Sequence, residues 1–197
     1  MSVRQGLLAL LEQEPMYGYQ LRAQFEARTG ATWPLNIGQV YTTLGRLERD
    51  GLIAADGDDG QGHVYYRVTD AGRTEVADWF ATPVERSTPP RDELAIKLAI
   101  AVTVPGVDVQ AVIQRQRTAT VRALQDYTRL KQTDSARDLA WLLVLDSLVF
   151  AAEAEVRWLD HCEARISRAT RNGSAVPAVT EPTDAVDTTT AALRLQS

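Results

Sequence analysis

The sequence has few of the residues that build disulfide frameworks, metal centres and nucleophilic active sites. Among its 197 residues are one cysteine, Cys162, and two histidines, His63 and His161. A single cysteine cannot form an internal disulfide, which is typical of a protein from the reducing cytoplasm. Two histidines without paired cysteines do not provide the ligand set of a zinc site. We therefore expect a cytoplasmic protein without a metal or any other cofactor.

Side-chain groups that catalyse reactions are also missing. His161 and Cys162 are adjacent, and adjacent side chains on a helix do not face each other, so they do not form a base–nucleophile dyad. The acidic segment "DGDDGQG" (residues 56–62) lacks the ligand spacing and terminal glutamate of a calcium-binding EF-hand loop. The sequence has no glycine loop of the phosphate-binding kind. These absences favour a protein that is not an enzyme.

Positive charge and long apolar runs are scarce as well. The net charge is −5, and residues 1–80 contain seven arginines, no lysine and eleven acidic residues. This balance argues against nonspecific coating of nucleic acid, so a DNA-binding surface would have to gather its positive charge on one face. The longest uncharged run near the middle, residues 98–107, has 10 residues, whereas a membrane-spanning helix needs roughly 20 apolar residues. Arg4 and an amphipathic pattern open the sequence in place of a signal peptide, so we expect no membrane partner.

The pattern of residues 1–80 predicts three short helices at its start. Apolar groups recur at helical spacing in residues 3–13 and again in residues 17–30, which end in a glycine. Asn36 is suited to the N-cap of a third helix and Gly51 to its C-cap. Three short helices with brief connections form a compact trihelical unit.

Two strands and a fourth helix are predicted next. Residues 52–55 and 64–68 are strand candidates, separated by the turn-rich segment "DGDDGQG". Thr69 is suited to cap a helix that continues through Phe80. Alternation in the second strand predicts three buried side chains, Val64, Tyr66 and Val68. The order of three helices, a hairpin and a helix predicts a winged helix-turn-helix in residues 1–80.

The rest of the chain is predicted to be helical. Residues 81–90 contain three prolines and are expected to be a linker between domains. Residues 91–171 then comprise the short, mostly buried helix "ELAIKLAIAV", a long helix capped by Asp108, and a second long helix from about residue 135. Residues 172–197 have few large apolar side chains, which predicts a disordered tail.

The second long helix is too long for the core of one small domain. At about 1.5 Å per residue it would exceed roughly 50 Å, and its apolar surface would promote aggregation if it stayed exposed. A second subunit related by a two-fold axis is the simplest way to bury this apolar surface. We therefore predict a mainly α-helical fold, with an N-terminal winged helix-turn-helix of three helices plus a β-hairpin wing, and a C-terminal α-helical dimerisation domain at 91–171.

The third predicted helix has two different faces at about 100° per residue. The apolar face comprises Ile37, Val40, Leu44 and Leu47. The opposite face has no acid and comprises Gly38, Gln39, Thr42, Gly45, Arg46 and Arg49. A recognition helix must fit a major groove about 12 Å wide, so this low, positive face indicates DNA binding; an ordinary solvated face is the plainer alternative. A glycine inside a helix costs about 0.5–1 kcal/mol relative to alanine, and close approach of a partner would account for Gly45.

Eight side chains are the candidate DNA contacts. In the third helix, Arg46 and Arg49 can reach a phosphate or a guanine edge, and Gln39 and Thr42 can hydrogen-bond to base edges. The phenol of Tyr41, on the flank, can reach a phosphate or complete the core. In the wing, the outward residues are His63, Tyr65 and Arg67. They can press on the minor groove or backbone, unless the segment is only an edge hairpin. The acidic loop argues against deep insertion of its tip, which leaves Arg67 as the main contact.

Three stretches carry a resemblance to a known family. They are "LLALLEQEPMYGYQL", "GQVYTTLGRLERDGLI" and "HVYYRVTDAGR", which cover most of residues 5–75. In letters, order and spacing the chain resembles the PadR family of bacterial transcriptional regulators, in its longer subfamily. The resemblance implies a dimeric winged-helix repressor with small aromatic or drug-like effectors. Many relatives carry a proline at the place of Thr42 and a basic or larger residue at the place of Gly45, so this chain is expected to hold DNA with fewer direct charges.

Aromatic residues of the C-terminal helices suggest where an effector could bind. Tyr127, Trp141, Phe150 and Trp158 are hypothesised to border an apolar cavity at the dimer interface, the kind of site that an aromatic effector needs. The plainer alternative is that these side chains anchor the core or the dimer.

These features predict a DNA-binding transcriptional regulator, a ligand-responsive homodimeric repressor of a palindromic operator. Two-fold symmetry would place two recognition helices about 34 Å apart, one turn of double-stranded DNA. The alternative is a dimeric winged-helix module that binds protein partners without specific DNA binding, which the acidic balance of residues 1–80 supports. DNA binding requires a positive stripe that joins Arg46, Arg49 and Arg67, whereas binding of protein partners does not.

Overall fold

The computed structural model describes residues 2–85, 91–133 and 138–171. The predicted tail, residues 172–197, lies outside the described residues. So does the second half of the predicted linker, residues 86–90.

Contacts between residues divide the chain into two compact units. Among the described residues, 2–85, 124–133 and 138–151 form the first unit, and 91–123 and 152–171 form the second. The first unit therefore includes the middle of the segment that the sequence assigns to the dimerisation domain.

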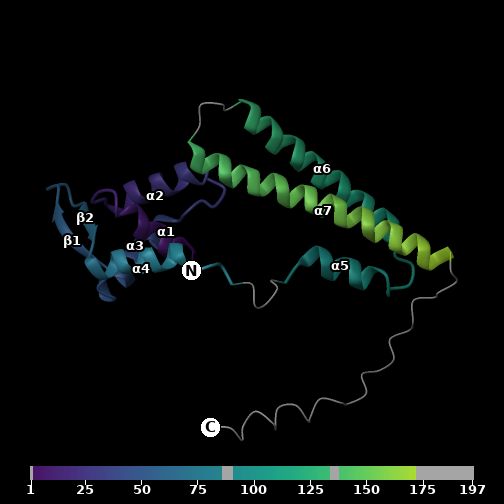
Figure 1. The fold of residues 1–197 in the computed structure, drawn as a ribbon, viewed down its shortest axis with the longest axis horizontal. Helices are drawn as coiled ribbons and strands as arrows, with labels where there is room; N and C mark the ends of the chain where they lie inside the picture. The colour runs from purple at the N-terminus through teal and green to yellow at the C-terminus, as the bar shows by residue number, and fades with distance from the viewer. Residues whose placement is uncertain (1, 86–90, 134–137, 172–197) are drawn as a thin grey trace, which may run out of the picture. The chain divides into compact units, whose positions relative to one another are not determined.

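The N-terminal part of the first unit has the element order that the sequence predicts. The elements are α1 (Ser2–Leu10), α2 (Gly18–Arg28), α3 (Ile37–Arg49), β1 (Ile53–Asp58), β2 (Val64–Val68) and α4 (Asp70–Ala81) (Figure 1). Three helices, an antiparallel hairpin and a further helix make a winged helix-turn-helix. The predicted fold class is confirmed.

One hydrophobic core joins the helices and the hairpin. Its most deeply buried side chains are Leu7, Leu8, Leu21, Val40, Leu44, Leu47, Ile53 and Val76. In α3 the predicted apolar stripe provides three of them, and Ile37 packs on the same core while partly buried. Fully burying one such side chain stabilises a fold by about 1.5–3 kcal/mol, so this stripe fixes which side of α3 faces inward.

The N-cap of α3 is the predicted Asn36, whereas its C-cap is Asp50 and not the predicted Gly51. Asn36 Oδ1 accepts a hydrogen bond from the Gly38 N–H at 2.8 Å, which is the role of an N-cap. Asp50 is the C-cap, and Gly51 follows it with a φ of +74°. Left-handed backbone just after a helix favours glycine, so Gly51 ends the helix one residue beyond its C-cap.

The first strand of the hairpin is longer than predicted. β1 pairs with β2 in antiparallel register from Ile53 opposite Val68 to Asp58 opposite Val64, with a bulge before Asp58. Beyond the bulge the ladder has left the core, and Val64 is 41% exposed. The prediction that Val64 is buried is therefore wrong. Val68 is buried and Tyr66 is half-buried.

Three helices make up the C-terminal part of the described chain. They are α5 (Glu93–Ala101), α6 (Val109–Thr133) and α7 (Leu139–Arg171). Asp108 caps α6 as predicted, since its Oδ1 accepts a hydrogen bond from a backbone N–H three residues on at 2.9 Å. α6 and α7 run antiparallel, side by side (Figure 1). Gln114 donates to Glu163 at 3.0 Å in the second unit, and Lys131 pairs with Asp146 at 2.6 Å in the first.

α5 is less buried than predicted. Leu98 and Ala101 are buried, whereas Ile96 and Ile100 are more than half exposed. The helix has apolar residues on both sides, which is why its pattern suggested a mostly buried helix. A single chain covers only one of these sides.

None of the helices in the described ranges combines the length and the apolar character that crossing a bilayer requires.

Gly72 in the first turn of α4 is required by packing. A Cβ at this position would overlap the Leu52 carbonyl oxygen. We expect Gly72→Ala to lower the free energy of unfolding by about 1–3 kcal/mol, because overpacking displaces backbone. Urea titration followed by circular dichroism measures this value.

Gly45→Ala is the matched control, because a Cβ there would have no atom within 4 Å. Alanine inside a helix is favoured over glycine by about 0.5–1 kcal/mol, so this variant should be more stable than the wild type. Equal shifts of the same sign in the two variants would contradict the packing argument.

Candidate nucleic-acid interface

α3 exposes the side opposite to its buried stripe. The six residues predicted for this side are all exposed: Gly38, Gln39, Thr42, Gly45, Arg46 and Arg49. Tyr41 flanks them and is 41% exposed. The open space around Gly45 shows that the packing of this chain does not require a glycine there. The low profile of this face, which we call the α3 face, is therefore available for another molecule.

A hollow of about 680 Å³ lies along the α3 face. Its lining residues are Val3, Leu35, Asn36, Gly38, Gln39, Thr42, Thr43 and Arg46. Among these lining residues only Arg46 is charged. Thr42 Oγ1 donates to the Gly38 carbonyl oxygen at 2.8 Å, so in this rotamer the hydroxyl can still accept a hydrogen bond. The hollow thus combines one cation with neutral polar groups.

The two arginines of α3 have different electrostatic surroundings. Arg46 makes no ion pair with any residue in the described ranges. Arg49 binds Asp50 Oδ1 through Nε at 3.1 Å and Nη2 at 2.9 Å, and Arg4 Nη2 lies 3.3 Å from Asp50 Oδ2. The hydrogen bond from Arg49 is the main cause that lowers the pKa of the Asp50 carboxyl, and Arg4 adds to it. Asp50 therefore stays ionised and offsets the charge of Arg49, while Arg46 is uncompensated.

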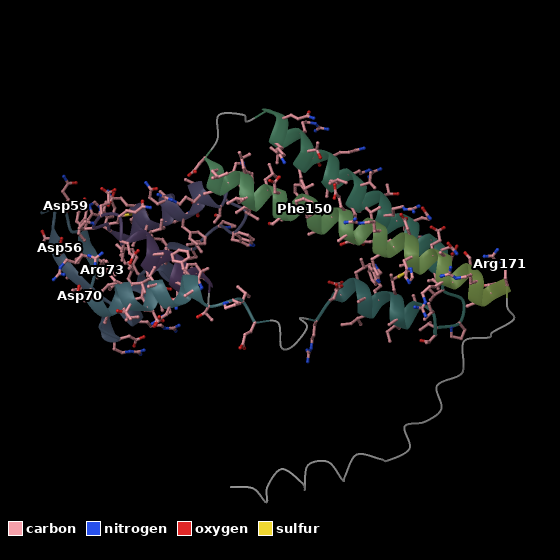
Figure 2. The ribbon with its side chains drawn as sticks, in the orientation of Figure 1. Asp56, Asp59, Asp70, Arg73, Phe150 and Arg171 are labelled. Atoms are coloured by element: carbon pink, nitrogen blue, oxygen red, sulfur yellow. The ribbon has the colours of Figure 1, made fainter. Side chains whose placement is uncertain are left out.

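Two basic side chains of the wing are paired with aspartates. Arg67 Nε lies 3.2 Å from Asp56 Oδ1, and His63 Nδ1 lies 2.6 Å from Asp59 Oδ2. The hydrogen bond with His63 is the main cause that lowers the pKa of the Asp59 carboxyl. Figure 2 shows both aspartates on the hairpin. The predicted positive stripe is therefore incomplete, because its arginines in the wing and at the end of α3 each share a carboxylate.

Aromatic rings fix the base of the wing against the start of α2. Tyr17 stacks on His63 with ring centroids 4.6 Å apart, and it meets Tyr65 edge to face at 5.3 Å. His63 and Tyr65 therefore position the wing rather than stand free of the protein. Arg67 keeps 54% of its side chain exposed, so it remains the more accessible of the three residues predicted in the wing.

Tyr41 is held in place by α2. Its ring lies edge to face with Tyr19 at 6.4 Å. A Cβ at Gly18 would lie 2.8 Å from the Tyr41 ring, so glycine is needed between the two tyrosines of the "YGY" triplet. Sequence reasoning misses Tyr17 and Tyr19 as parts of this surface. The triplet itself, with a glycine in the first turn of a helix, is the signal that could have found them.

The four aromatic residues hypothesised for an effector cavity lie in different surroundings. Trp141 is buried in the first unit and lines a cavity with residues of α2. Phe150 is 66% exposed on α7 (Figure 2), and Tyr127 is half-buried on α6. Trp158 packs against the core of the second unit. These four side chains therefore differ in burial and in the residues around them, and a cavity that they border at a dimer interface stays a prediction.

Two family profiles match the chain. The profile of the transcriptional regulator PadR-like family matches residues 7–78, and that of the virulence activator alpha C-terminal region matches residues 90–167. A probable transcriptional regulator of Mycobacterium tuberculosis is 28% identical over 179 residues, which cover 81% of this chain and 95% of that protein. The negative transcriptional regulator PadR of Bacillus subtilis is 24% identical over 179 residues, covering 84% and 98%.

Solved structures of Bacillus subtilis PadR share the fold. The structure in complex with operator DNA has a TM-score of 0.65 at 21% identity and covers 84% of this chain and 99% of that chain. The structure in complex with p-coumaric acid has a TM-score of 0.67 at 21% identity, with coverage of 85% and 99%. The likeness extends over both the winged helix and the C-terminal helices.

Proposed function

We propose that this chain, a DNA-binding transcriptional regulator of the PadR-like family, acts as a ligand-responsive homodimeric repressor. In this proposal its α3 enters the major groove of a palindromic operator. The observation that carries this proposal is the α3 face, where one uncompensated arginine stands among small side chains. The name of the Bacillus relative, a negative regulator, supports repression. The alternative of a protein-interaction module without DNA binding is not supported, because the matching profile and relatives are transcriptional regulators.

The proposed compartment, activity and effector follow from the assignment as a transcriptional regulator. A regulator of transcription acts where the chromosome is, so the proposed compartment is the cytoplasm. The proposed activity is binding alone, without catalysis. The proposed effector is a small aromatic or drug-like molecule, since a PadR structure with p-coumaric acid provides an example on the same fold.

Three residues of α3 form the proposed reading edge. Gln39, Thr42 and Arg46 are spaced by three and four residues, so their side chains leave the helix on the same side. An arginine can bind guanine O6 and N7 together, and a glutamine or threonine can bond to a neighbouring base edge; one good bidentate contact discriminates by about 1–3 kcal/mol. Tyr41, Arg49 and Arg67 then face the phosphate backbone on either side.

The uncompensated charge of Arg46 gives the sharpest test. We expect Arg46→Ala to weaken operator binding about tenfold or more, and Arg49→Ala to weaken it less, because Arg49 already shares Asp50. Fluorescence anisotropy with a duplex selected from random DNA by the wild-type protein measures the affinity. If Arg46 contacts a phosphate, its loss should also reduce the slope of log affinity against log salt by about 0.9.

Arg171→Ala is the control, because it removes the same charge from the end of α7 in the second unit. It should leave specific affinity nearly unchanged. Equal losses in the Arg46 and Arg171 variants would mean that only net charge matters, and α3 would no longer be the recognition helix.

Gly45 supports the proposal independently of charge. Its Cβ position is open within this chain, so alanine should stabilise the protein while placing a methyl group on the surface that faces DNA. We expect Gly45→Ala to weaken operator binding about tenfold although it raises the free energy of unfolding. Anisotropy and urea titration on one preparation measure both effects. Unchanged affinity would show that the backbone of α3 does not approach the DNA closely.

The proposed dimer rests on an apolar face of α7. Leu139, Leu143 and Phe150 are each more than 60% exposed, and at about 100° per residue they lie within about 40° of one another. Trp141 and Leu145, on the opposite side, are buried. A helix that is apolar on both sides needs a second cover, and a second copy of this chain provides one by two-fold symmetry.

A charge in the middle of this face should separate the subunits. We expect Phe150→Glu to convert the dimer to monomer at micromolar concentration, because an unpaired carboxylate would be buried at the interface. Analytical ultracentrifugation measures the mass. Phe80→Glu is the control, since Phe80 is 71% exposed on α4 and outside this face. Dissociation of both variants, or of neither, would remove α7 as the interface.

A further inference from the structure

The second half of α7 presents a basic side to solvent. Basic residues recur there at spacings of four, four and three, so their side chains leave the helix within about 80° of one another. All of them are exposed: Arg157, His161, Arg165 and Arg168. We call these four residues the α7 stripe. The winged helix shows no comparable row of basic side chains among its described residues.

The arginines of the α7 stripe are not neutralised by other side chains of the described chain. Within the described residues, none of the three makes an ion pair. The two acidic residues that lie between them in sequence, Asp160 and Glu163, pair with Arg117 of α6 instead. These two carboxylates leave α7 about 60° or more away from the stripe. The stripe therefore has three uncompensated positive charges.

The winged helix has the opposite charge balance. Residues 1–80 contain seven arginines and eleven acidic residues. Four of these arginines are ion-paired, namely Arg4, Arg22, Arg49 and Arg67. Affinity for DNA of any sequence comes from contacts between basic side chains and phosphates. The winged helix is therefore poorly equipped to hold DNA other than its operator, whereas the α7 stripe has free cations for this task.

The α7 stripe has dimensions that suit duplex DNA. From Arg157 to Arg168 the helix rises about 17 Å at about 1.5 Å per residue. Each strand of duplex DNA carries one phosphate per about 3.4 Å of the axis, so the stripe is as long as about five phosphates in a row. Ala154 and Ala164, which are exposed beside the stripe, are small and allow a DNA backbone to approach closely.

Partners of other kinds fit the α7 stripe less well. Binding to a membrane surface requires large apolar side chains exposed beside the cations, whereas Trp158, Leu159 and Ile166 of this half of α7 pack in the core of the second unit. Single-stranded nucleic acid stacks on aromatic side chains, and the stripe contains no Phe, Tyr or Trp. A second copy in two-fold contact through the stripe would set like charges opposite each other.

We propose that the α7 stripe is a second DNA-binding surface, which binds the phosphate backbone of duplex DNA outside the operator without reading its sequence. This inference rests on the assignment of the chain as a DNA-binding regulator, and not on the proposed reading edge of α3. The stripe supplies the affinity for arbitrary sequence that the winged helix lacks. It thereby keeps the regulator on the chromosome, where sequence-independent contacts let a protein slide along DNA toward its operator.

A duplex of scrambled sequence tests the α7 stripe in the full chain. We expect the double variant Arg165→Gln, Arg168→Gln to bind this duplex about tenfold or more weakly at low salt, with the slope of log affinity against log salt reduced by about 1.8. Fluorescence anisotropy measures both. The matched control is Arg115→Gln, Arg122→Gln, which removes two exposed arginines of α6 in the same unit and should leave the slope nearly unchanged. Equal losses in the two double variants would mean that only net charge matters and would overturn the proposal.

Operator binding separates this inference from the proposed function. A short duplex that contains only the selected operator should bind the wild type and the stripe variant equally, because α3 reads it. Arg46→Ala should show the reverse pattern, with weaker operator binding and nearly unchanged binding of the scrambled duplex. A stripe variant that loses both duplexes alike would overturn the stripe as a separate surface. Unchanged operator affinity of the Arg46 variant would refute the reading edge of α3 and leave the stripe standing.

Polyglutamate and lipid vesicles distinguish DNA from other polyanions. We expect labelled polyglutamate to bind the wild type more weakly than a scrambled duplex of equal charge, because duplex DNA has a condensed counterion layer to release. We expect vesicles that contain phosphatidylglycerol to bind weakly, since the stripe has no apolar residue to insert. If either probe bound through Arg165 and Arg168 as tightly as the duplex, the stripe would be a surface for acidic proteins or membranes, and the proposal would be overturned.

Discussion

The orientation of α3 about its own axis depends on three buried side chains. Val40, Leu44 and Leu47 are each at most 1% exposed, and their spacing of four and three residues makes one stripe. Because each residue advances by about 100° around a helix, burial of this stripe determines what the other side presents. Arg46 and Gly45 face outward because the leucines face inward. Within the described residues the Arg46 guanidinium has no ion pair and the Cβ position of Gly45 is open, so both are available to a partner.

Charge on this acidic chain is arranged by pairing. Asp50 takes up part of the charge of Arg49 and Arg4, and Asp56 pairs with Arg67. Each phosphate contact contributes about 0.9 to the salt dependence of DNA binding and supplies affinity that does not depend on sequence. Four of the seven arginines of residues 1–80 are paired in this way, which reduces nonspecific affinity. In the proposed complex, recognition of DNA would then depend more on base edges, on close approach at Gly45 and on the symmetry of two subunits.

Sequence patterns between neighbouring residues predicted most of the fold, whereas contacts between residues far apart in the sequence could not be predicted from them. The cap at Asn36 and the stop at Gly51 depend on residues next to them in the chain, so the sequence was sufficient. The exposure of Val64 depends on a bulge in the opposite strand, which alternation within β2 cannot reveal. The ion pair of Arg67 with Asp56 spans the hairpin for the same reason. The pairing of Arg49 with Asp50 joins neighbours in sequence, and only the side-chain rotamers decide whether it forms.

The aromatic residues of the C-terminal helices show a second limit of periodicity. Helical spacing tells which residues share a face, but not which element that face meets. Trp141 and Phe150 are nine residues apart, which puts them about 180° apart around α7. Trp141 lies on Gly30 and is buried, whereas Phe150 is exposed. They therefore cannot border one cavity from the same helix of one chain, although both are aromatic.

Because Trp141 and Phe150 lie on opposite sides of α7, the two sides of this helix have different partners. On the proposed dimer side, Leu139, Leu143 and Phe150 would be held by the partner subunit, so the helix could not move freely. On the other side, Trp141 packs against Gly30, and the next residue of this turn, Ala31, is left-handed with a φ of +52°. When one side of a helix is fixed and the other bears on a strained turn, the turn is the softer element. A perturbation at Trp141 would therefore displace the turn, and α3 with it, before it displaced α7.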